Sequence, residues 1–178
     1  DVIVGAPKND GNGADSGAAF IYFGGASMDN TIDVNMTGVG ASDQHGSSVA
    51  SAGDINGDGY DDVIVGARFN DGNGLNSGAA FIYFGGANIR NNSIGINLTG
   101  VDAYDLQGRS VASAGDVNGD GYDDVIVGAF NNTGNGFATT DGSGAAFVYF
   151  GGGRRWISVF AQEANLQKGL EIGSLKFD

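Results

Sequence analysis

The chain has 178 residues, of which 34 are glycine, one is proline, none is cysteine and 41% are hydrophobic. This apolar share is enough for a packed core, so the chain is not a disordered glycine-rich linker, and the lack of cysteine excludes a disulfide scaffold. The formal net charge of −13 makes nucleic acid and anionic membrane surfaces poor partners, and no apolar run is long enough to insert into a membrane.

The chain repeats itself from its first residues onward. Asp1, Asp62 and Asp124 each begin the pattern Asp-Val-Ile-Val-Gly-Ala, at spacings of 61 and 62 residues. Asp1 corresponds to the last position of an acidic loop that is complete in the later repeats. We therefore expect the sequence to be a piece of something longer.

Each period carries the signals of short strands. Val63-Ile64-Val65 and the run Phe81 to Phe84 are apolar at consecutive positions, which predicts burial on both faces. Equivalent runs, weaker segments and Ser/Ala-rich segments recur at 18–23, 31–37, 47–53, 93–99, 109–115 and 145–150. No stretch has helical periodicity. The sequence predicts an all-β fold of β-propeller blades, each with four antiparallel strands and the Ser/Ala-rich strand innermost.

The repeat boundaries divide the chain into blades. We expect a partial blade without its first strand at 1–40, a complete blade at 41–102 and a third blade at 103–162. The fourth strand of the third blade is placed at Trp156 to Phe160. Residues 163–178 form either a divergent tail or the start of a next blade.

An acidic loop precedes two of the β-branched runs. Its sequence is Asp-Ile/Val-Asn-Gly-Asp-Gly-Tyr-Asp-Asp, at 54–62 and again at 116–124. Oxygen-bearing side chains at loop positions 1, 3, 5 and 9 suit a hard cation such as Ca²⁺, and position 7 offers a main-chain carbonyl. The glycines permit positive φ angles. The predicted ligands are Asp54, Asn56, Asp58, Tyr60, Asp62, Asp116, Asn118, Asp120, Tyr122 and Asp124.

Two other interpretations of the acidic loops were weighed. An EF-hand needs a bidentate glutamate at position 12 and helices on both sides, whereas position 12 is Val65 or Val127 inside a strand pattern. The second alternative is a pair of acidic turns that hold no metal. At position 8, Asp61 and Asp123 are expected to point to solvent.

Other residues carry weaker signals. His45, the only histidine, has no acidic or nucleophilic partner at a telling spacing and is predicted to be a turn residue. Tyr22, Tyr83 and Tyr149 are predicted to pack between blades. The Asn/Asp/Gly-rich stretches at 9–16 and 70–77 are predicted to be long turns, with a second weak cation or sugar site as the alternative.

The pattern Gly-x-Ser-Val-Ala-Ser-Ala-Gly-Asp, followed by the acidic loop and Val-Ile-Val-Gly-Ala, resembles the FG-GAP repeat. That repeat builds the seven-bladed propeller of integrin α subunits and occurs widely in bacterial surface and secreted proteins. The resemblance covers residues 1 to about 152, and the close similarity of the repeats suggests a bacterial-type array. In this chain His45 and Gln107 replace the phenylalanine of the "FG", and the "GAP" is intact only at Gly5-Ala6-Pro7.

The resemblance implies an extracellular adhesion or ligand-binding module in which Ca²⁺ is structural. Its partners would be an extracellular protein or carbohydrate ligand and the remaining propeller blades. The alternatives are a non-catalytic propeller domain of a secreted enzyme, of polysaccharide lyase or phospholipase type, and a lectin-like propeller. No catalytic arrangement stands out in the sequence, so we do not expect an enzyme.

Overall fold

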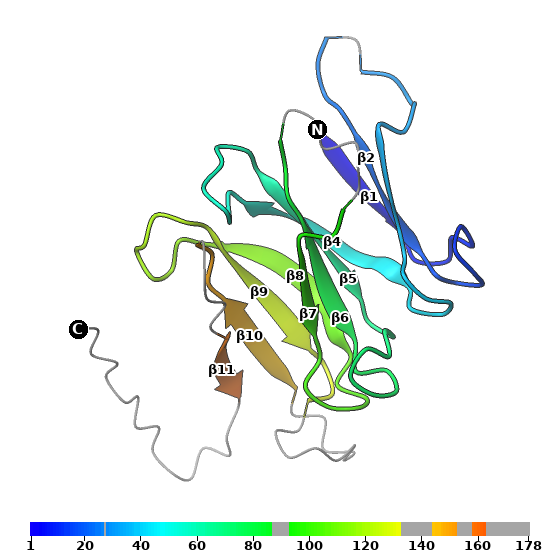
Figure 1. Ribbon diagram of the computed structural model, residues 1–178, viewed down its shortest axis with the longest axis vertical. Coiled ribbons are helices and arrows are strands. Elements are labelled where there is room, and N and C mark those ends of the chain that lie inside the picture. The colour runs from blue at the N-terminus through cyan, green and yellow to red at the C-terminus, as the bar shows by residue number, and fades with distance from the viewer. Residues whose placement is uncertain (27, 87–92, 133–143, 153–157, 163–178) are drawn as a thin grey trace.

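The computed structural model describes residues 1–26, 28–86, 93–132, 144–152 and 158–162 (Figure 1). These residues form three antiparallel sheets and no helix. The first sheet is β1 (Val2–Ala6), β2 (Ala18–Tyr22) and β3 (Val34–Thr37); the middle sheet is β4 (His45–Gly53), β5 (Asp62–Ala67), β6 (Ala79–Tyr83) and β7 (Ile96–Thr99); the third sheet is β8 (Gln107–Gly115), β9 (Asp124–Ala129), β10 (Ala145–Tyr149) and β11 (Ser158–Gln162). Within each sheet, every strand pairs with the strand next to it in the sequence.

The middle sheet is buried on both faces because its strands are apolar at consecutive positions. On β5, Ile64 faces the third sheet while Val65 faces the first, and both side chains are fully buried. On β6, Ile82 and Phe81 divide between the two faces in the same way. The burial of both faces predicted from the sequence is thus confirmed.

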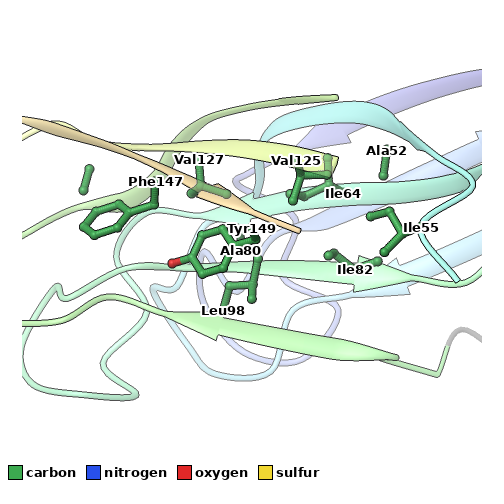
Figure 2. Packing of buried hydrophobic residues seen from close by; sticks show 11 residues of the cluster. Ala52, Ile55, Ile64, Ala80, Ile82, Leu98, Val125, Val127, Phe147 and Tyr149 are labelled. Carbon is green, nitrogen blue, oxygen red and sulfur yellow. The ribbon is translucent and has the colours of Figure 1, made fainter. Parts of the chain in front are cut away.

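Two apolar clusters join the sheets. The cluster between the middle and third sheets contains Ile55 and Ile82 together with Val125, Val127 and Tyr149 (Figure 2). The cluster between the first and middle sheets contains Ala19, Ile21, Val34, Met36, Val65, Ala67, Ala79, Phe81 and Tyr83. Tyr83 and Tyr149 therefore pack between sheets, as predicted.

The Ser/Ala-rich strands β4 and β8 allow neighbouring sheets to approach closely. Ser48 Oγ on β4 donates a hydrogen bond to the Gly108 carbonyl on β8 at 2.8 Å. A Cβ on Gly66 would lie 2.0 Å from the same carbonyl oxygen, so only glycine fits there. Stacked four-stranded sheets with small residues on their inner strands are the arrangement of consecutive propeller blades. The predicted all-β propeller fold is confirmed as a partial propeller whose sheets do not close a ring.

Among the described residues, the outer faces of the two end sheets carry partly exposed apolar side chains. Val2 and Val4 on β1 are 47% and 43% exposed, and Ile126 on β9 is 37% exposed. The equivalent residues of the middle sheet lie between neighbours. Their exposure follows from position in the array, since all three sheets carry the same sequence pattern.

His45 corrects one prediction. It is the first residue of β4, fully buried, and its Nε2 lies 3.0 Å from the Tyr83 hydroxyl. Gln107 takes the same place at the start of β8, and its Nε2 donates to the Tyr149 hydroxyl at 3.1 Å. The residue is not in a turn because the pairing of β4 with β5 extends to His45, which lies opposite Ala67.

The end of the chain is described only in part. β11 begins at Ser158, two residues after the start predicted for this strand, and pairs with β10. Trp156 and residues 163–178, including the predicted divergent tail, lie outside the described residues. Within the part that the structure describes, no helix is long and apolar enough to cross a membrane.

Candidate metal centre

The two acidic loops connect equivalent strands of neighbouring sheets. Residues 54–61 join β4 to β5, and residues 116–123 join β8 to β9. Strands flank each loop on both sides, and loop position 12 falls on Val65 in β5 and on Val127 in β9. The EF-hand alternative is therefore excluded.

The first aspartate organises each loop. Asp54 Oδ1 accepts hydrogen bonds from the backbone N–H of Gly57 at 2.7 Å and Asp58 at 3.1 Å, and Oδ2 accepts one from Gly59 at 2.9 Å. The second loop repeats these contacts around Asp116. Gly57 and Gly59 have φ angles of 77° and 86°, which glycine adopts without steric cost.

The middle positions of the loop are exposed or half-buried. Asn56 Nδ2 donates to Asp58 Oδ2 at 3.0 Å, and Asp58 Oδ1 accepts the Tyr60 N–H at 3.0 Å. In the second loop, Asn118, Asp120 and Tyr122 make the same contacts. These side chains stay within reach of solvent and of an incoming ion.

The last aspartate of each loop is buried. Asp62 accepts the N–H of Ile55 at 3.0 Å and that of Gly85 at 2.7 Å, and Asp124 does the same with Val117 and Gly151. Burial raises the pKa of Asp62 to about 6; the two hydrogen bonds lower it, and the nearby charges of Asp58 and Asp54 raise it. The pKa of Asp116 is lowered, first by the hydrogen bond from the Gly121 N–H.

The two acidic loops have the residue types that bind a divalent cation, but their side chains are not arranged around one point. Among the residues that the structure describes, no three His, Cys, Asp or Glu side chains are gathered so that they hold a metal ion. The carboxylates of each loop instead accept hydrogen bonds from their own backbone. A buried carboxylate with two further carboxylates nearby is an arrangement that a divalent cation would relieve. The ten predicted ligands remain a prediction.

Contacts between the loops correct a second prediction. Asp123 does not point to solvent: its Oδ2 accepts the Asp54 N–H at 2.9 Å, and its own N–H donates to the Asp54 carbonyl at 3.2 Å. Asp61, the equivalent residue of the first loop, is exposed as predicted. The sequence shows an aspartate at position 8 of both loops. It does not show that this aspartate binds the backbone of an adjacent loop where such a loop is present, as Asp123 does.

The Asn/Asp/Gly-rich stretches use their polar groups internally. In 70–77, the Asn70 side chain accepts the Gly72 N–H at 3.0 Å and donates to the buried carboxylate of Asp43 at 2.8 Å. Asn73 Nδ2 donates to the carbonyls of the β7–β8 connection. Equivalent turn contacts occur at Asn9 and Asn12. These contacts agree with the prediction of long turns.

Comparison with known proteins identifies the repeat. The family model described as FG-GAP repeat matches residues 45–83 and 107–149, which lie in the two sheets that carry complete loops. The chain is 34% identical to integrin alpha-5 of Xenopus laevis over 139 residues, covering 73% of this chain and 13% of that protein. It is also 34% identical to human integrin alpha-6 over 135 residues, covering 75% of this chain and 11% of that protein.

A third relative, integrin alpha-2 of Bos taurus, is 42% identical over 90 residues, which cover 48% of this chain and 7% of that protein. The chain thus spans only a small part of the curated relatives it matches. These relatives are vertebrate proteins and give no support to the expected bacterial origin. The matched repeats, the stacked sheets and the integrin alpha relatives together show that the chain belongs to the FG-GAP repeat family.

Proposed function

We propose that the chain is a calcium-binding segment of an integrin-alpha-like propeller, in which calcium stabilises the fold and does no chemistry. The observation that carries the proposal is the burial of Asp62 beside the carboxylates of Asp54 and Asp58 in a loop that is already folded. A bound dication would neutralise charges that otherwise oppose that burial. The relatives are integrin alpha subunits, and their family membership supports the same function.

Each loop offers one set of oxygen ligands. Asp54, Asn56, Asp58 and Asp62 supply side-chain oxygens, and Tyr60 supplies its main-chain carbonyl. Asp116, Asn118, Asp120, Tyr122 and Asp124 supply the second set. Extracellular modules bind calcium with dissociation constants of about 0.1 to 1 mM. At about 1 mM calcium, a loop at the tighter end of this range gains about 1.4 kcal/mol of stability by mass action.

The test is a calcium titration of chelator-treated protein by calorimetry, with melting temperature as a second readout. We expect binding heat and a raised melting temperature for the natural chain. Asp58→Asn combined with Asp120→Asn should abolish both, because each substitution removes one charge from a ligand set. Asp71→Asn, which removes a charge from a turn outside the loops, is the matched control. The absence of both heat and a melting shift in the natural chain would refute the proposal.

The wider role that we propose is extracellular or cell-surface adhesion, with binding of a protein or carbohydrate ligand. The net charge of −13 and the acidic loops attract calcium ions, which are abundant outside the cell, and repel nucleic acid. We assign no catalytic role, because the only histidine in the sequence, His45, is enclosed between two sheets. Screening the chain with calcium against a glycan array and immobilised matrix proteins separates the two ligand classes. Binding to neither would refute the adhesion role.

A further inference from the structure

The repeat that contains the third sheet holds the backbone at the start of the first acidic loop. Asp123 and Asp54 are joined by two hydrogen bonds: Asp123 Oδ2 accepts the Asp54 N–H at 2.9 Å, and the Asp123 N–H donates to the Asp54 carbonyl at 3.2 Å. The Gly152 N–H donates to the Ile55 carbonyl at 2.9 Å, and the Ile55 N–H donates to Asp62 Oδ2 at 3.0 Å. The backbone N–H and carbonyl groups of both loop residues are therefore fixed, mostly by the neighbouring repeat.

Side chains reinforce this contact. The Ile55 side chain is fully buried between the middle and third sheets (Figure 2). A Cβ on Gly53 would collide with Asp123 Oδ2. A Cβ on Gly57 would lie 2.5 Å from Tyr122 Cε1. Glycines at these two positions therefore let the carboxylate and the aromatic ring of the neighbouring repeat lie directly against the first loop.

The held backbone carries the first predicted ligand of the loop. The Asp54 carboxylate accepts the N–H groups of Gly57, Asp58 and Gly59, so the position of Asp54 sets the course of the loop. A binding site that is already ordered gives up less conformational entropy when its ligand binds. A residue that fixes Asp54 should therefore raise the affinity of the first loop for calcium.

Asp123 belongs to the second loop by sequence, where it occupies position 8. Asp116 and Asp120 of that loop accept hydrogen bonds from N–H groups of the second loop itself. The Asp123 carboxylate instead accepts the N–H of Asp54 in the first loop. One carboxylate of the second loop thus acts on the loop of the preceding repeat.

We propose that Asp123 is a positioning residue for a calcium ion bound in the first loop, and that calcium binding there strengthens the contact between the middle and third sheets. This inference rests on the proposed calcium-binding function. Its second part follows from its first, because a contact that raises the affinity for calcium is itself strengthened to the same degree when calcium binds. Asp123 acts on the ion through the backbone of Asp54 and is not itself a ligand.

The test isolates the first loop in the full 178-residue chain by Asp120→Asn, which removes a predicted ligand charge from the second loop. Calcium is titrated into this chelator-treated chain by calorimetry. Asp123→Ala should weaken calcium binding by the first loop about tenfold, because the Asp54 N–H loses its acceptor. Asp123→Asn keeps an oxygen that can accept this N–H and should bind calcium nearly as tightly as the parent. This rescue separates positioning from attraction between the Asp123 charge and the ion.

Two further measurements separate positioning from a general loss of structure. In a chain whose first loop is disabled by Asp58→Asn, Asp123→Ala should change the calcium affinity of the second loop much less than it changes that of the first. In the Asp120→Asn chain, calcium should slow hydrogen exchange of the Gly152 amide, which donates to the Ile55 carbonyl. Asp123→Ala should reduce this slowing.

Four results would each overturn the inference while leaving the proposed function standing, because each requires that the parent chains bind calcium. Asp123→Ala could leave the affinity of the first loop unchanged, or Asp123→Asn could lose as much affinity as Asp123→Ala. The second loop could weaken as much as the first, or calcium could leave the exchange of the Gly152 amide unchanged. If neither single-loop chain binds calcium, the proposed function falls and this inference falls with it.

Discussion

Replacing the buried His45 by glutamine should remove a defined part of the chain's sensitivity to acid. His45 is fully buried beside Tyr83, and burial lowers its pKa from 6.5 to about 4. In the unfolded chain the imidazole regains its ordinary pKa, so the unfolded state binds more protons between these values. Stability is therefore fully present above pH 6.5 and is lost as the pH falls towards 4.

The size of the effect follows from that pKa difference. Between pH 7.5 and pH 5, the imidazole alone should reduce the free energy of unfolding by about 2 kcal/mol. Glutamine suits the site because Gln107 fills the same position in the next repeat, where it donates to Tyr149 and to the Leu98 carbonyl. The His45→Gln chain should therefore lose this pH-dependent part while staying within about 1 kcal/mol of the parent at pH 7.5.

Urea unfolding at a series of pH values measures the effect as the difference between the two chains, so that the many aspartates contribute equally to both. The reverse substitution, Gln107→His, is the matched variant and should add a pH dependence of similar size. Identical pH slopes for the parent and the His45→Gln chain would show that His45 is not held neutral by burial.

Two further predictions use the asymmetry between the repeats, and a third uses the exposed apolar side chains of the end sheets. Ile55→Ala should lower the free energy of unfolding in urea by about 2 to 5 kcal/mol, because the side chain is fully buried. Val117→Ala, at the equivalent position, should lower it by less than about 0.5 kcal/mol. Equal losses would contradict the packing described for the first loop. Asp123→Ala should cost about 1 to 3 kcal/mol by leaving the Asp54 N–H without its acceptor, and Asp61→Ala should cost much less, as thermal unfolding of the two variants would reveal. The exposed apolar side chains of the end sheets should make the chain self-associate, and Ile126→Asp should lower the mass seen by light scattering; a monodisperse natural chain that stays monomeric at high concentration would argue against this.

Much of the fold was predictable because the strand signals are local. Consecutive apolar residues at Val63-Ile64-Val65 and in the run from Phe81 predict strands that are buried on both faces. In a fold without helices, stacked sheets are the arrangement that buries both faces. The backbone of the acidic loop was equally predictable. Its glycines take the expected positive φ angles. The hydrogen bonds that its first aspartate accepts from the loop amides were not among the predictions, which placed this carboxylate on a cation.

The errors arose where a residue's role depends on the adjacent repeat. Asp61 and Asp123 have the same local sequence, yet one is exposed and the other binds the neighbouring loop. His45 looked isolated because its partner Tyr83 lies 38 residues away in the chain. The sequence did hold a signal for these pairs. His45 and Gln107 occupy one repeat position, and Tyr83 and Tyr149 occupy another, so a contact between the two positions would occur in both repeats.

The close approach of Gly66 to the Gly108 carbonyl limits where this architecture can diversify. Any side chain at that glycine on β5 would push β8, and the third sheet with it, away from the middle sheet. Sequence change that creates new surface chemistry is consequently confined to the turns at the strand ends, where added atoms meet water. A repeat array of this kind can acquire new binding specificities at its periphery while its axis stays nearly invariant in shape.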